Sequence, residues 1–261
     1  MQPTPSHSYR IMEIDFLRGI AIILMIIFHL VVDLRDFYFY NLEYLRGFWY
    51  LEGKLSAILF IVISGISSTL GRNSIRHGLT IFAWAMLLTV ITYLYNDNCY
   101  ILFGILHFLG ISLLTANLMR HLPNAWLLLI SSIVIFIGVV LFQPFVTNPY
   151  LFPLGLMTNT FVSLDYYPLF PWYGLFLLGI LLGKLLYANK KERLDLSQAS
   201  PTPFELLFCS LPLDLHKTIT WLGQHSLIVY LIHQPILLAL LYIVHYLISL
   251  RQTVFLLQGF L

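Results

Sequence analysis

The segment from residue 13 to residue 34 holds several charged or titratable side chains within an otherwise apolar run. On a helix with about 100° per residue, Arg18, His29 and Asp33 fall within about 60° of one another, and Asp15 falls beside Asp33. A carboxylate four residues from an imidazole can orient the ring and stabilise its protonated form, an arrangement that suits a general base. The sequence therefore predicts His29 as a catalytic base that Asp33 assists.

Arg18 stands eleven residues before His29, which separates them by about 16 Å along the helix axis. One side chain then lies near one end of the helix, and the other lies in its opposite half. A guanidinium at such an end can grip a phosphate or a carbonyl, with Asp15 beside it. The alternative is that Arg18 only anchors the orientation of the helix and Asp33 is an interfacial residue.

Two further histidines, His107 in FGILHFLG and His233 in LIHQP, also lie in apolar runs. Pro235 deprives the carbonyl of Leu231 of its helical donor, which predicts a kink next to His233. Kinks with polar groups at mid-membrane often line cavities, so we expect His29, His107 and His233 to share one cavity. The alternatives are a hydrogen-bonded histidine at a helix contact for His107 and a structural kink at His233.

The composition requires a membrane around these residues. Of the 261 residues, 59% are hydrophobic and 10% are charged, whereas soluble domains carry about 25% charged residues. A water-facing surface cannot be built from so few charges without exposing large apolar patches. The charge pattern shows no basic face for nucleic acid, and the net charge is only +2.

The apolar runs predict an all-α membrane bundle of about seven transmembrane helices, in a single domain over residues 1–261. The runs are 14–34, 54–71, 76–95, 100–119, 125–142, 170–188 and 222–248. Positive residues favour the cytoplasmic side, which predicts an inner N-terminus and an outer C-terminus. The inner side then holds Arg10, Arg18, Arg72, Arg76, Arg120, Lys184, Lys190, Lys191, Arg193 and Lys217, and the outer side Arg35, Arg46, Lys54 and Arg251.

Two connections are long. The outer connection, 143–169, is rich in aromatic residues and predicts a folded cap or a re-entrant segment. The inner connection, 189–221, predicts a cytoplasmic loop with one short interfacial helix. Cys99 and Cys209 fall on opposite sides in this topology, so no disulfide between them is expected.

Several blocks resemble known membrane acyltransferases. The opening EIDFLRGIAIILMIIFH, 13–29, reproduces the spacing from Arg18 to His29 that is found in the acyltransferase-3 group. The blocks at 103–110, 166–183 and 222–235 are similar to bacterial relatives of heparan-α-glucosaminide N-acetyltransferase, and the resemblance extends from residue 10 to about residue 240. In one respect the chain departs from the pattern: the lysosomal enzyme uses a histidine in the loop after its first helix, and 35–53 has none here.

This resemblance implies a bacterial inner-membrane enzyme that takes an acyl group, typically acetyl, from cytoplasmic acyl-coenzyme A. The acceptor would be a sugar amine or hydroxyl on the outer side. Arg18 and Asp15 would then face the acyl donor. His29, assisted by Asp33, would lie at the transfer point, and His107 and His233 compete for its role. A general-base route and an acyl-imidazole route both remain open.

Two other functions use the same histidines. Buried imidazoles relay protons in transporters and channels, and two imidazoles at matching depth on facing helices can bind haem iron. The lack of an internal repeat speaks weakly against the common transporters. We expect membrane lipid, acyl-coenzyme A and a glycan or amino-sugar acceptor as partners, and no metal and no nucleic acid. The sequence leaves open whether the chain forms a homodimer.

Overall fold

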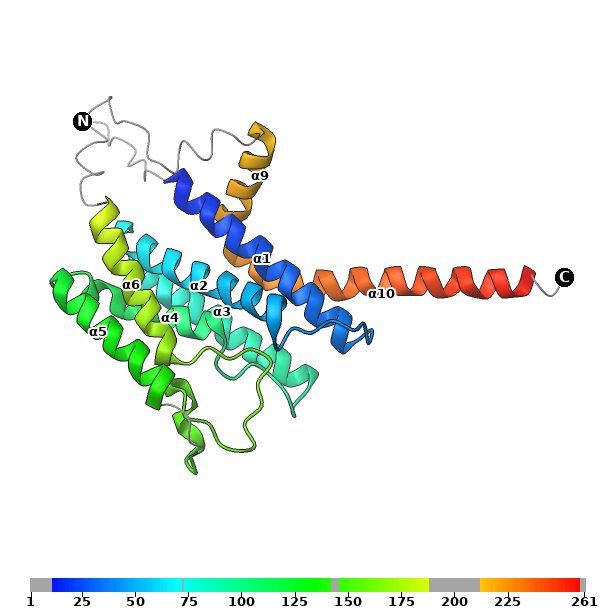
Figure 1. Cartoon of the computed structure of the whole chain (residues 1–261), viewed down its shortest axis with the longest axis horizontal. Helices are drawn as coiled ribbons and strands as arrows, with labels where there is room; N and C mark the ends of the chain where they lie inside the picture. Colours follow the sequence, from blue (N-terminus) through cyan, green and yellow to red (C-terminus); the bar gives the residue numbers. More distant parts are fainter. Residues whose placement is uncertain (1–10, 72, 142–145, 188–211, 259–261) are drawn as a thin grey trace. The chain divides into compact units, whose positions relative to one another are not determined.

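The structure is a computed structural model that describes residues 11–71, 73–141, 146–187 and 212–258 (Figure 1). Within these ranges every regular element is a helix, apart from an isolated bridge between Phe103 and Tyr166. The predicted all-α class is thus confirmed for this part of the chain. The contacts divide the chain into two compact units, Met1–Leu59 with Pro201–Leu261, and Phe60–Ser200. The boundary passes through a helix, α2 (Gly47–Leu70).

The first unit is built around α1 (Met12–Asp36), which contacts both C-terminal helices, α9 (Leu213–Gln224) and α10 (Ser226–Gln258). In Figure 1 the α9 helix lies against the first half of α1. Gly19 on α1 makes this close approach feasible, because a β-carbon there would collide with the carbonyl of Ile219. Gly223 does the same from α9, where a β-carbon would collide with the carbonyl of Asp15.

The start of α2 packs on the middle of α1 in the same unit. The hydroxyl of Ser56 donates to the carbonyl oxygen of Ala21 at 2.9 Å, and a β-carbon at Gly53 would meet the ring of Phe28. A hydroxyl bonded to a neighbouring helix satisfies a polar group that lipid cannot solvate. The two contacts show that α1 and α2 run antiparallel here.

The second unit contains the rest of α2 and two helix pairs. The first pair is α3 (Ser74–Tyr95) with α4 (Ile105–Met119), and the second is α5 (Asn124–Phe136) with α6 (Leu169–Tyr187). A π-helical turn, η1 (Ile137–Leu141), continues α5, and a 3-10 helix, η2 (Pro149–Leu154), lies in the long connection to α6. Small residues bring helices together, since Gly78 on α3 meets Gly110 on α4 and Gly65 on α2 meets Gly179 on α6.

The α4 helix begins at Ile105, five residues after the predicted start at 100. The preceding residues are not helical and are bonded to the connection before α6, whose Tyr167 N–H donates to the carbonyl of Phe103 at 2.9 Å. Oδ2 of Asp165 then accepts the N–H of Ile105 at 2.9 Å, which caps the helix with a side chain sixty residues away. The prediction of a helix over 100–104 was therefore wrong, because this tertiary contact outweighs the local apolar pattern.

The connection between α5 and α6, described from residue 146 onward, packs on itself, and whether it is a cap or a re-entrant segment stays a prediction. Its aromatic rings stack on one another, with Phe161 contacting both Phe152 and Tyr166. The hydroxyl of Tyr166 donates to the carbonyl of Phe152 at 2.6 Å, and burial raises the pKa of Tyr166 to about 12. The phenol therefore stays protonated and remains a donor within this connection.

Five of the seven predicted apolar runs are helices long and apolar enough to cross a membrane. They are α1, α2, α3, α6 and the portion Ser226–Arg251 of α10. The other two, Ile105–Met119 and Asn124–Val140, are shorter apolar helices. The last predicted run, 222–248, is divided between α9 and α10, and α10 continues to Gln258. A multi-pass membrane protein is supported, and the count of seven crossings remains a prediction.

Two of the basic side chains predicted on the inner side bind backbone carbonyls. A guanidinium nitrogen of Arg120 donates to the carbonyl of Gly71 at 3.4 Å, and the ammonium of Lys184 donates to the carbonyl of Leu122 at 2.6 Å. These two cations therefore satisfy backbone carbonyls near the ends of helices. The inner connection is described only from Pro212 onward, where α9 provides a short helix. Arg10, Arg72, Lys190, Lys191, Arg193 and Cys209 lie outside the described residues.

Candidate functional site

His29 and Asp33 lie one turn apart in the second half of α1, as the sequence predicted. Nδ1 of His29 lies 2.9 Å from the carbonyl oxygen of Met25. A carbonyl can only accept, so Nδ1 carries the hydrogen, and the lone pair of the neutral ring is on Nε2. The ring is thus oriented by the carbonyl of Met25 on its own helix, whereas the sequence predicted Asp33 for this role, and the side-chain hydrogen bond of Asp33 goes to Gln234.

His233 has the same bonding pattern on α10. Its Nδ1 lies 2.6 Å from the carbonyl oxygen of Tyr230, which again places the lone pair on Nε2. That Nε2 is buried and has no hydrogen-bond partner among the described residues. Pro235 follows two residues later and lies inside α10, and the kink expected there stays a prediction.

The structure brings these two histidines into contact. The rings of His29 and His233 meet edge to face, with centroids 4.8 Å apart and planes at 84°. Asp33, only 2% exposed, accepts a hydrogen bond at its Oδ1 from Nε2 of Gln234 at 2.8 Å. We call His29, Asp33, His233 and Gln234 the α1–α10 polar cluster.

The unpartnered polar atoms of this cluster are all hydrogen-bond acceptors. Oδ2 of Asp33, Nε2 of His233 and Oε1 of Gln234 are buried and have no hydrogen-bond partner within the described ranges. With Asp33 as a carboxylate, each of them is an acceptor, and Nε2 of His29 adds a fourth lone pair. Buried polar groups without partners are costly, so a cluster of acceptors indicates a site for a ligand that supplies donors.

Sequence reasoning did not select Gln234 as a site residue. The available signal was its polar side chain between His233 and Pro235 in the apolar run LIHQPIL. A second residue that the sequence analysis passed over is Glu52 on α2, which is 8% exposed and whose two carboxyl oxygens have no partner among the described residues. It precedes Gly53, the residue packed on Phe28, so the antiparallel register of α1 and α2 places it near the depth of His29.

His107 belongs to the second unit, and both of its ring nitrogens are already bonded there. Nδ1 accepts the N–H of Gly104 at 3.2 Å, so Nε2 carries the hydrogen and donates to the hydroxyl of Thr89 at 3.1 Å. The Thr89 hydroxyl donates onward to the carbonyl of Ile101 at 2.8 Å. The ring is 3% exposed and stacks on Phe103. This pattern favours the structural alternative for His107, and the catalytic role that its sequence suggested has no support from the bonding of its nitrogens.

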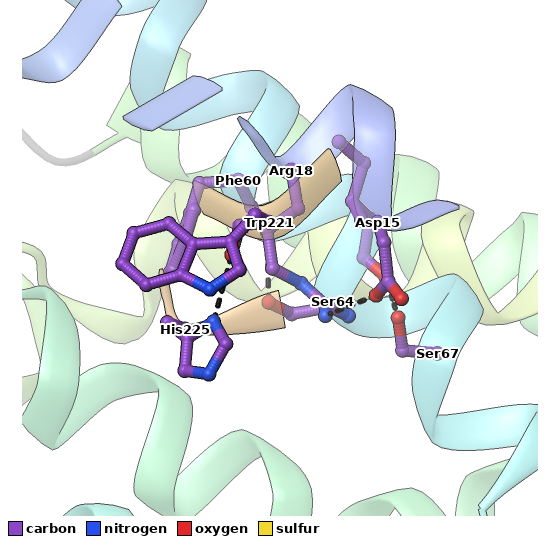
Figure 2. Close-up of polar contacts among 8 residues, drawn as sticks. Asp15, Arg18, Phe60, Ser64, Ser67, Trp221 and His225 are labelled. Carbon is purple, nitrogen blue, oxygen red and sulfur yellow. Dashed lines mark hydrogen bonds and ion pairs between the residues drawn. The ribbon is translucent and has the colours of Figure 1, made fainter. Parts of the chain in front are cut away.

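Arg18 and Asp15 lie in the first turns of α1, on the stripe that the sequence predicted. Their side chains form an ion pair with 3.2 Å between Nη1 and Oδ1 (Figure 2). Both side chains are largely buried, with 21% and 11% of their surfaces exposed. A paired and partly buried guanidinium keeps several donors in a defined orientation, which suits the recognition of a phosphate or a carbonyl.

The α9 helix covers this end of α1 with aromatic groups. The ring of His216 stacks on Phe16 at 5.0 Å between centroids. At the end of α9, Nδ1 of His225 donates to the carbonyl of Trp221 at 2.9 Å, and Figure 2 shows both residues together with Arg18. The α9 helix thus packs directly beside the ion pair of Asp15 and Arg18.

No group of three or more ligands that could hold a metal ion occurs in the described part of the chain.

Comparison with known proteins agrees with the resemblance seen in the motifs. A family model described as heparan-alpha-glucosaminide N-acetyltransferase, catalytic, matches residues 10–235. The match includes Arg18, His29, Asp33, His233 and Gln234, and it ends within α10. No curated protein and no solved structure matches the chain. Because the family model covers most of its length, the chain belongs to the family of the heparan-α-glucosaminide N-acetyltransferase catalytic domain.

Proposed function

We propose that this protein transfers an acyl group, typically acetyl, from cytoplasmic acyl-coenzyme A to the amine of a sugar on the outer side of a bacterial inner membrane. The observation that carries the proposal is the α1–α10 polar cluster, whose unpartnered atoms are acceptors. An ammonium group offers three N–H donors and a positive charge, whereas a hydroxyl offers one donor. A carboxylate beside two imidazoles is therefore better matched by an amine.

In this proposal His29 performs the proton transfer. The amine enters as an ammonium, gives one proton to Nε2 of His29, and its nitrogen then attacks the carbonyl carbon of the thioester. The C–S bond breaks as the C–N bond forms, and the second proton of the nitrogen goes to the departing thiolate. The products are the amide and coenzyme A, with one proton released in total. Asp33 stabilises the positive charge in the site before and during the transfer.

The acyl-imidazole route differs in one step. Nε2 of His29 would attack the thioester first and carry the acyl group until the amine takes it. The lone pair on Nε2, which the bond from Nδ1 to Met25 requires, serves both routes. Label retained on the protein when acceptor is withheld is the result that distinguishes the acyl-imidazole route.

The donor end of the proposal rests on Arg18 and Asp15. Arg18 lies three turns, or about 16 Å, before His29 on the same helix, near the end assigned to the cytoplasm. Its ion pair with Asp15 holds the guanidinium in place for an anionic or carbonyl group of the coenzyme. This assignment of Arg18 to the donor side requires an inner N-terminus, which together with seven crossings gives an outer C-terminus.

The experiment uses purified protein with radiolabelled acetyl-coenzyme A and two matched acceptors, glucosamine and N-acetylglucosamine. The second acceptor keeps the hydroxyls but has no amine. We expect label on glucosamine alone. Label on both sugars would show that a hydroxyl, and not the amine, is the acceptor. Label on neither sugar, with the protein folded, would contradict the transferase proposal for these substrates.

The haem alternative finds little support in the geometry of the first unit. Two imidazoles that held one haem iron would have the iron between their coordinating nitrogens, which keeps the two rings apart. The rings of His29 and His233 are in edge-to-face contact with centroids only 4.8 Å apart. An absorption spectrum of the purified protein near the Soret region tests this alternative directly.

A further inference from the structure

We infer that Gln234 is a positioning residue of this site, which acts by holding the carboxylate of Asp33. The inference rests on the proposed function for its activity readout. Its physical basis is the hydrogen bond from Nε2 of Gln234 to Oδ1 of Asp33 at 2.8 Å, which joins α10 to α1. The bond also decides the orientation of the amide, because only the nitrogen can donate to a carboxylate.

The bond has a consequence for the other carboxylate oxygen. With Oδ1 occupied by the amide, the plane of the carboxylate is set, and Oδ2 is the oxygen that remains for a ligand. A carboxylate held on one side by a neutral donor can stabilise a cation on the other side without being neutralised by a protein cation. Asp33 also interacts electrostatically with His29 and Asp36 on its own helix, and His233 is the titratable neighbour from α10.

Gln234 is placed for this role by the helix around it. It lies between His233, whose ring contacts His29, and Pro235, which has no N–H to give to the preceding turn. The same short segment therefore supplies one imidazole and the donor that orients the carboxylate. A shift of the carboxylate by about 1 Å is of the size that lowers turnover about 10²-fold in positioned sites.

The test compares two variants of nearly the same size. Gln234→Met removes the donor, and Gln234→Glu replaces it by a carboxyl group that donates only when protonated. Two carboxyls in contact share a proton at higher pH than either would hold it alone. We therefore expect both variants to lose about 10²-fold in turnover at pH 8, with little change in the KM for acetyl-coenzyme A.

The pH dependence separates positioning from simple structural support. As the pH falls toward about 5.5, the introduced carboxyl is protonated and donates to Asp33 as the amide does. The ratio of Gln234→Glu turnover to wild-type turnover should then rise about tenfold, whereas the ratio for Gln234→Met should stay flat. Gln224 lies at the end of α9 and outside the cluster. Gln224→Glu and Gln224→Met are the matched controls and should leave turnover unchanged.

A thermal-unfolding series over the same pH range needs no substrate. The midpoint of Gln234→Glu, relative to wild type, should also recover at low pH if its carboxyl restores the bond. Recovery of the midpoint in a protein that transfers no acyl group would support the bond and contradict the proposed function. Recovery of the midpoint without recovery of the turnover ratio would reduce Gln234 to a structural residue, and no recovery of either would overturn the inference.

Discussion

The imidazole of His29 on α1 meets the imidazole of His233 on α10 edge to face, at 4.8 Å between ring centroids. Each ring gives its Nδ1 hydrogen to a carbonyl of its own helix, so both lone pairs lie on Nε2. The sequence presented these histidines as competitors for one role. Their contact makes them neighbours in one polar cluster.

His29→Ala should lower turnover by at least about 10²-fold, because a positioned base contributes about 10²–10⁴-fold to rate. Affinity for the acyl donor should change little, since Arg18 lies three turns away. Asp33→Asn should lower turnover less, because Asp33 stabilises charge without carrying the transferred proton. The measurement is acyl transfer at saturating donor, with folding checked by thermal shift, and near-normal turnover in His29→Ala would contradict the assignment.

His233→Ala combined with His29→Ala tests whether the two rings act as a unit. Residues that share one catalytic step are strongly non-additive, so the double variant should lose little more than His29→Ala alone. Turnover of wild type, both single variants and the double variant completes the cycle. Losses that multiply would show that the two histidines serve independent steps.

His107→Ala should act on stability. The substitution leaves the buried N–H of Gly104 without its acceptor, which costs about 1–3 kcal/mol, and it removes the bond to Thr89, whose hydroxyl still donates to Ile101. We expect a lower unfolding midpoint, with turnover per folded molecule close to wild type. Thr89→Val is the matched variant, since it removes the same bond from the other side. Loss of turnover at an unchanged midpoint would return His107 to the catalytic candidates.

Arg18→Ala should weaken binding of acyl-coenzyme A and leave the histidine chemistry intact. A lysine at this position should restore only part of the affinity, because it lacks the planar fork of the guanidinium. Equilibrium binding of the donor to the wild type and to both variants is the measurement. Unchanged affinity in Arg18→Ala would leave this residue as an anchor of topology.

A reporter fused after Leu261 should be active on the outer side of the membrane. The prediction follows from the ten inner and four outer basic residues of the seven-crossing arrangement. The matched control is a fusion in the inner connection before α9, which should be active in the cytoplasm. Cytoplasmic activity after Leu261 would require an even number of crossings and would reverse the side on which the acceptor binds.

The helices themselves follow from the sequence, because in lipid each backbone polar group has to be satisfied within its own segment. Apolar runs such as 14–34 and 76–95 therefore appear as α1 and α3 with ends shifted by two residues at most. The same local rule identified His29 and Asp33 as polar groups one turn apart. The family too could be inferred from short motifs, and the match over residues 10–235 bears it out.

Only the tertiary structure decided which polar groups meet. The bond from Gln234 to Asp33 and the contact of His233 with His29 join helices from opposite ends of the chain, and no local pattern encodes such a pairing. Asp165 likewise moved the start of α4 to Ile105 by accepting its N–H from a distant connection. Periodicity and apolar length reflect how favourably one segment is solvated by lipid. Whether the acceptors of the polar cluster find donors depends instead on which helices pack beside them.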